Sequence, residues 1–115
     1  MSDYVNQVDL ERKRGDTFPY KVKLVDEDYK DYDITNCTFQ MSIHTERDPV
    51  DTSTQVALLN GVIVDTKPAI VGFPFNSTQA DQTPGTYYYD IQMTDEYGYT
   101  LTFQDGAIVF VQDKV

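Results

Sequence analysis

Residues 86–103 read TYYYDIQMTDEYGYTLTF, and this stretch decides the fold class. Along its first half, aromatic and apolar residues occupy every second position, which places them on one face of an extended strand. Residues 95–98, Asp-Glu-Tyr-Gly, then supply a turn, and the alternation resumes beyond it. The stretch therefore predicts a β-hairpin with one face turned towards a core. The residues expected on that face are Tyr87, Tyr89, Ile91, Met93, Tyr99, Leu101 and Phe103.

The same period of two recurs nearer the N-terminus. Residues 18–25 and residues 38–44 each alternate, so each predicts a strand with one apolar face. Residues 45–54 are polar and contain Asp48-Pro49, which favours a loop because proline lacks the N–H that a central strand donates. The residues expected to face the core from the two strands are Phe18, Tyr20, Val22, Leu24, Phe39, Met41 and Ile43. Those expected on the outer face of the second strand are Thr38, Gln40, Ser42 and His44.

Asn60-Gly61 is a favoured two-residue hairpin turn, because both residue types tolerate a positive φ. It predicts that residues 55–59 pair with residues 62–65. Further short strands are expected at residues 70–75 and, after Asp105-Gly106, at residues 107–111.

A single helical turn is the most helix that the chain predicts. Asn76 is a capping residue before a short helix-tolerant segment, which Thr83-Pro84-Gly85 ends. Turn signals recur every 8 to 12 residues or so, a spacing typical of all-β domains with about seven or eight strands. The sequence therefore predicts an antiparallel sandwich or small barrel, with residues 10–115 as one domain and residues 1–9 as an N-terminal arm or edge strand.

Composition narrows the function. The chain has 115 residues and a formal charge of −10, which repels the phosphate backbone of nucleic acids, so DNA or RNA binding is not expected. No run of about 18 apolar residues occurs, which argues against membrane insertion. Cys37 is the single cysteine, so no disulfide can form within the chain. Synthesis and folding in a reducing cytoplasm are expected, without a cofactor.

Catalysis is not expected either. His44 is the single histidine, and Cys37, seven positions away, is the nearest candidate nucleophile. The chain has no Gly-x-Ser-x-Gly elbow and no glycine-rich phosphate loop. His44 is therefore interpreted as a solvent-facing strand residue.

An acidic run suggests calcium at first sight, since hard cations prefer carboxylate oxygens. Its spacing does not fit a helix-loop-helix site, because Asp31 stands where such a loop needs glycine and Cys37 where it needs glutamate. A solvated turn is the preferred interpretation, and no metal site is expected. Arg14-Gly15-Asp16 is likewise interpreted as an ordinary turn before a strand. The acidic run consists of Asp26, Glu27, Asp28, Asp31 and Asp33.

Tyrosines are the best candidates for contact residues, because tyrosine offers a large contact area with little side-chain entropy to lose. Tyr88 projects from the face opposite its two tyrosine neighbours, and others lie in predicted turns. The alternative is that these rings pack locally on turns and sheet edges. The candidate interface residues are Tyr4, Tyr29, Tyr32, Tyr88 and Tyr97.

Several motifs occur in an order that is similar to a known family. They are residues 14–18 (RGDTF), residues 32–43 (YDITNCTFQMSI), residues 84–92 (PGTYYYDIQ) and residues 106–111 (GAIVFV). Together they resemble the amino-terminal, immunoglobulin-like domain of phage baseplate upper proteins. Asn36 stands where that family usually has glycine, and asparagine accepts left-handed backbone geometry.

The resemblance implies an immunoglobulin-like β-sandwich and a non-enzymatic structural role in a bacteriophage virion, in the tail, the baseplate or an adaptor. The implied partners are other phage structural proteins or further copies of the chain. Two alternatives stay open: a capsid decoration or head-fibre protein, and a carbohydrate-binding, adhesin-like module in which tyrosine rings stack on sugars.

Overall fold

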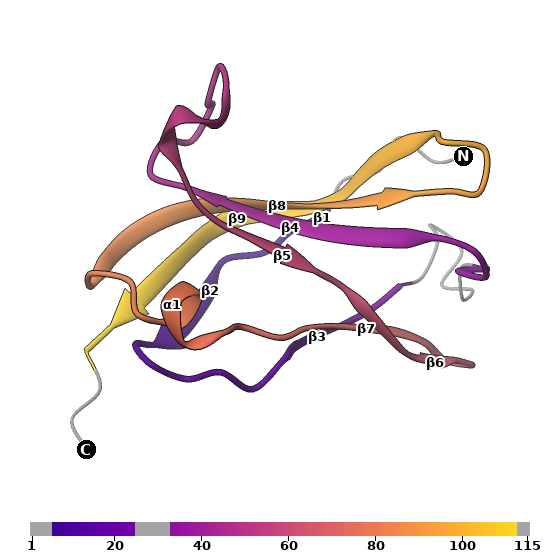
Figure 1. The fold of residues 1–115 in the computed structure, drawn as a ribbon, viewed down its shortest axis with the longest axis horizontal. Coiled ribbons are helices and arrows are strands. Elements are labelled where there is room, and N and C mark those ends of the chain that lie inside the picture. The colour runs from indigo at the N-terminus through magenta and orange to yellow at the C-terminus, as the bar shows by residue number, and fades with distance from the viewer. Residues whose placement is uncertain (1–5, 25–32, 113–115) are drawn as a thin grey trace.

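The structure, a computed structural model, describes residues 6–24 and 33–112 and consists of two β-sheets packed face to face (Figure 1). The larger sheet contains β1 (Asn6–Gln7), β2 (Leu10–Lys13), β4 (Thr38–His44), β5 (Gln55–Asn60), β8 (Gly85–Thr94) and β9 (Thr100–Val111). The smaller sheet contains β3 (Tyr20–Lys23), β6 (Val62–Thr66) and β7 (Ala69–Phe73). The strand orders are β1-β9-β8-β4-β5, with β2 also paired to β9, and β3-β7-β6. The prediction of an all-β sandwich is confirmed.

The core lies between the two sheets and follows the predicted alternation closely. In β4 and in most of β8, every second residue is buried, as expected. Phenyl rings from the larger sheet meet edge to face, with 6.2 Å between the centroids of Phe39 and Phe103. The largest fully buried side chains are those of Phe73, Phe110, Ile34, Met41, Ile43, Leu59, Ile91, Ile108 and Val71.

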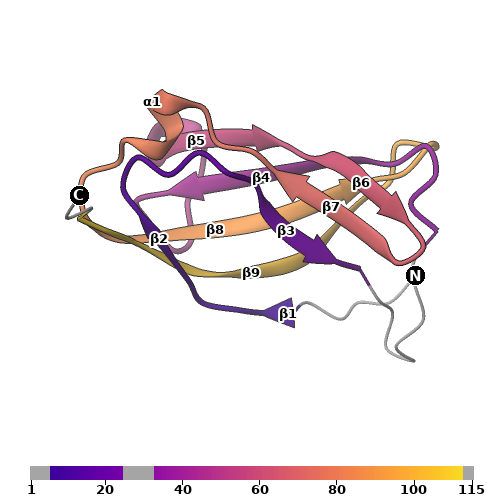
Figure 2. The same ribbon diagram turned by 90° about the horizontal axis from the view of Figure 1, so that it is seen from below.

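The hairpin predicted at Asn60-Gly61 is wrong. The strand before it pairs with β4, and the strand after it pairs with β7 in the other sheet. A Cβ on Gly61 would lie 2.6 Å from Phe39 Cβ and 2.8 Å from Val71 Cγ1. Glycine is needed here because the backbone lies against core side chains where it crosses from one sheet to the other at the edge of the sandwich, between β5 and β6 (Figure 2).

The N-terminal segment supplies an edge strand, and its pairing is parallel. β1 and β2 both pair with β9 in the parallel direction, so the larger sheet is mixed and not purely antiparallel. The break expected at Asp105-Gly106 does not occur, since β9 runs through it without interruption. A Cβ on Gly106 would lie 2.2 Å from the Val8 carbonyl oxygen, so glycine here lets the chain cross closely between β1 and β2.

Two residues expected in the core are on the surface. Phe18 is 64% exposed, because it covers the outer side of a buried arginine. The Arg12 guanidinium carbon lies 4.7 Å from the centroid of the Phe18 ring and 4.0 Å from that of Phe75. Tyr99 is also exposed, since it belongs to the turn after β8, where its backbone N–H donates to the Asp95 carboxylate.

The predicted helical turn and the turn at Arg14-Gly15-Asp16 are confirmed. The helical turn α1 (Ser77–Ala80) begins with a capping box between Asn76 and Gln79, and a second short turn, η1 (Thr52–Thr54), was not expected. Gly15 has a φ of 90°, as the turn at Arg14-Gly15-Asp16 requires. Asn36 has a φ of 61°, the left-handed geometry expected of it.

Candidate functional site

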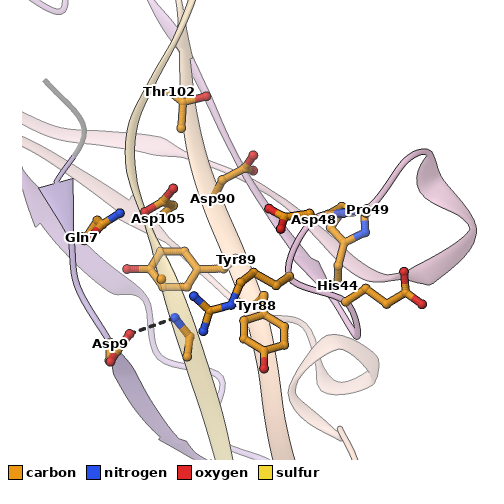
Figure 3. Close-up of a pocket in the computed structure, with 14 residues that line it drawn as sticks. Gln7, Asp9, His44, Asp48, Pro49, Tyr88, Tyr89, Asp90, Thr102 and Asp105 are labelled. Atoms are coloured by element: carbon orange, nitrogen blue, oxygen red, sulfur yellow. Dashed lines mark hydrogen bonds between the residues drawn. The ribbon is translucent and has the colours of Figure 1, made fainter. Parts of the chain in front are cut away.

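The outer face of the larger sheet carries a shallow groove of about 870 Å³ (Figure 3). Gln7 and Asp9 line it from the N-terminal edge, and residues 46–49 line it from the loop after β4. β8 and β9 lie between these two sides in the sheet. The groove is therefore built from segments far apart in the sequence, and for this reason no single sequence motif predicted it.

Carboxylates dominate the floor of the groove. Asp90 lies directly opposite Asp105 in the pairing of β8 with β9. The pKa of Asp90 is raised, mainly because its carboxyl group is partly buried, and Asp105 raises it further while His44 opposes the shift. The site thus favours a ligand that brings positive charge or hydrogen-bond donors.

His44 lies at the end of the groove, and both of its ring nitrogens have partners. Nε2 is 2.8 Å from Ser42 Oγ and Nδ1 is 3.1 Å from Thr54 Oγ1. Gln55 Nε2 also donates to Ser42 Oγ, at 2.8 Å. Ser42 lies in β4, which pairs with β5 on one side and with β8 on the other, so the peptide groups around Ser42 are used in strand pairing. The arrangement fastens the loop after β4 to the sheet face.

Cys37 and His44 do not form a catalytic pair. Cys37 directly precedes β4 and His44 is its last residue, and seven residues of extended chain span roughly 23 Å. The pKa of Cys37 is raised by burial first, and then by Asp95, Asp33 and Glu96. A raised pKa disfavours the thiolate, which is the nucleophilic form.

Asp33, the one residue of the acidic run that the structure describes, closes a turn, and so does Asp95. Asp33 accepts a hydrogen bond from the Thr35 N–H at 3.1 Å, and Asp95 accepts one from the Tyr97 N–H at 2.9 Å. The rest of the run between Asp26 and Asp31 lies outside the described residues. Within residues 6–24 and 33–112, no group of three or more His, Cys, Asp or Glu side chains is placed to hold a metal ion. In the same part of the chain, no helix is long and apolar enough to cross a membrane.

The two predicted contact tyrosines that the structure describes, Tyr88 and Tyr97, lie apart. Tyr88 lines the groove, with the Arg47 guanidinium carbon 5.0 Å from its ring centroid. Tyr97 is 78% exposed at the opposite end of β8, in the turn that leads to β9. Tyr4, Tyr29 and Tyr32 lie outside the described residues.

A second surface lies on the outside of the smaller sheet, and we call it the small-sheet face. It is apolar at the centre: Val62 is 57% exposed and Val64 is 52% exposed, and β6 is exposed along its whole length. A Cβ on Gly72 would lie 3.3 Å from Val64 Cγ2 and 3.4 Å from Pro19 Cβ, so these side chains close over the glycine. The members of the small-sheet face are Pro19, Lys21, Lys23, Val62, Val64, Asp65, Ile70 and Gly72.

The sequence did contain a signal for this surface. Val62-Ile63-Val64 is a continuous apolar run, and such a run indicates a strand with apolar groups on both faces. Interpreting residues 62–65 as one arm of a hairpin concealed it, because a hairpin arm needs only one apolar face.

Comparison with protein-family models and with curated proteins finds no match to this chain. The fold and the two surfaces are therefore the basis for assigning a role.

Proposed function

We propose that this chain is a non-enzymatic structural protein of a bacteriophage virion, a component of the tail or baseplate or an adaptor, and that it works through protein–protein contacts. The virion is its proposed location. The small-sheet face is the observation that carries the proposal. A folded domain that leaves a cluster of apolar side chains on one sheet face has a surface suited to covering by a partner.

Two further features support the same role. The motif order resembles that of baseplate upper proteins, which gives the phage setting. The N-terminal edge of the larger sheet is itself held by an added parallel strand, so this fold accommodates strands at its edges.

The test is quantitative mass spectrometry of purified particles of the phage that encodes the chain. A fixed number of copies per particle is the expected result, and absence from washed particles would overturn the proposal. A sharper version uses phage carrying Val62→Ser and Val64→Ser, for which we expect reduced incorporation. Val50→Ser is the matched control, because Val50 is 96% exposed and lies in the loop between β4 and β5. Equal incorporation of both variants would remove the small-sheet face from the contact.

The groove favours a second candidate, a carbohydrate-binding module. An aromatic ring beside carboxylate hydrogen-bond acceptors is a combination that suits sugars, and Tyr88 and Asp90 supply it. Arg47 lies over the Tyr88 ring, which leaves less of the ring for stacking. Binding on a glycan array that disappears in Tyr88→Ala would support this function, and no binding to any glycan would end it.

A further inference from the structure

The two outer surfaces of the sandwich differ in local charge. The small-sheet face carries Lys21 and Lys23, which alternate along β3 with the buried Val22. These are two of only nine basic residues in a chain of formal charge −10. Asp65, opposite Ile70, is the one carboxylate among the residues of this face, so two lysines against one aspartate leave the small-sheet face basic overall on an acidic protein.

The groove has the opposite character. It is lined by five carboxylates against Arg47 and His44. Asp90 and Asp105 stand side by side on its floor, and a cation from outside would relieve their mutual repulsion. The carboxylates are those of Asp9, Glu46, Asp48, Asp90 and Asp105.

We propose that the occupant of the small-sheet face is a second copy of this chain, presenting the groove-bearing face of its larger sheet. Lys21 and Lys23 of one copy then meet Asp90 and Asp105 of the next, and the valines of β6 are covered. The inference rests on the proposed structural role and names the partner within it. Charge complementarity selects this arrangement, because stacking two small-sheet faces would bring the lysines of both copies together.

The geometry makes this contact heterologous. The two surfaces face outward from opposite layers of the sandwich, as Figure 1 shows. Each copy that binds one neighbour therefore keeps a free surface for another, and association continues into a row or closes into a ring.

The experiment is sedimentation equilibrium of the full chain over a range of protein and salt concentrations. We expect association that increases with protein concentration and weakens as salt rises, because the paired charges are screened. Lys21→Glu with Lys23→Glu, and separately Asp90→Lys with Asp105→Lys, should each weaken self-association at least about tenfold. An equimolar mixture of the two double variants should associate again, since each basic surface then meets an acidic one.

Circular dichroism verifies that each variant is folded, and Asp90→Asn with Asp105→Asn replaces the lysine variant should that one fail to fold. Lys13→Glu, at an exposed position of β2, is the control for net charge and should leave association unchanged. A wild-type chain that is monomeric under all conditions overturns the inference, as does an assembly that ignores the groove substitutions. Either result leaves the copy number in purified particles to decide the proposed function separately.

Discussion

The outer faces of the two sheets differ in the side chains that they expose. On the larger sheet, the outward residues of β4 are polar, and they bind one another, as in the contact between Ser42 and His44. On the smaller sheet, the exposed residues of β6 include Val62 and Val64, whose side chains have no polar group, beside Asp65. An outward-facing side chain is therefore not always polar. We interpret the polar face as a surface exposed to solvent and the apolar face as one that a partner covers.

The free energy gained when a partner covers each face differs in the same direction. Fully burying a valine side chain contributes roughly 1.5–3 kcal/mol. Val62 and Val64 are each about half exposed, so covering both would contribute a similar amount in total. The polar face gains little from being covered, because each hydrogen bond lost to a partner must be replaced.

The largest effect is expected where the chain passes between the sheets. Gly61→Val should cost about 3 kcal/mol or more of unfolding free energy, because its Cβ alone would lie 2.6 Å from Phe39 Cβ and 2.9 Å from Phe73 Cε1. Urea unfolding followed by circular dichroism measures this. Val62→Ala, the neighbouring exposed position, is the control and should stay within about 0.5 kcal/mol of wild type. A Gly61→Val protein of wild-type stability would show that β5 and β6 do not cross as described.

A smaller effect is expected at the edge of the larger sheet. Tyr89→Phe should cost about 1–2 kcal/mol, because the Tyr89 hydroxyl donates to the Val8 carbonyl at 2.6 Å and accepts from Gln104 Nε2 at 3.0 Å. Faster hydrogen exchange in β1 and β2 is the accompanying result, measured by mass spectrometry. Unchanged exchange there would show that this hydroxyl does not hold the edge strand.

The pH dependence of the same substitution has a definite sign. Burial raises the pKa of Tyr89 from its ordinary value of 10.0 to about 12. The unfolded chain therefore loses this proton first, and wild-type stability falls as pH rises from 10 towards 12. The advantage of wild type over Tyr89→Phe should shrink across that window.

The strands and their inward faces were predictable because each strand carries its own alternation, as β4 and β8 show. Which strands pair was not predictable at Asn60-Gly61, since the contacts that require glycine come from Phe39 and Val71, distant in sequence. Alternation also misplaced Phe18, because it takes no account of a buried arginine that needs an aromatic cover.

The candidate site was less predictable than the fold. Tyr88 was expected to face outward and does, but its neighbours in the groove come from β1, β9 and the loop after β4. The small-sheet face was not expected, because it depends on Val64 and Pro19, distant in sequence, both lying close to Gly72. Both surfaces are products of strand pairing that local sequence does not specify.

The two faces themselves can be compared by one substitution on each. Ser42→Ala should cost about 1 kcal/mol, because His44 Nε2 and Gln55 Nε2 both lose a partner. Val64→Ser should change the unfolding free energy of the monomer by no more than about 0.5 kcal/mol, because Val64 is half exposed. Thermal unfolding at low protein concentration measures both. A larger loss for Val64→Ser would mean that the small-sheet face stabilises the single chain, and would undo the contrast.

The smallest effect is expected from the charge on the groove floor. Burial raises the pKa of Asp90, so its carboxylate disfavours the folded state at neutral pH, and Asp90→Asn should raise the melting temperature slightly. The gain in melting temperature should disappear as pH falls below 3.8, the ordinary pKa of aspartate, because the carboxyl is then protonated in both the folded and the unfolded state.

Asp51→Asn should instead lower the melting temperature. Hydrogen bonds from Ser53 lower the pKa of Asp51, so its carboxylate stabilises the fold at neutral pH. The two substitutions should therefore change stability in opposite directions, because the Asp51 carboxylate accepts a hydrogen bond in the fold and the Asp90 carboxylate is destabilised by burial. A loss of stability in Asp90→Asn would show that the Asp90 carboxylate also stabilises the fold.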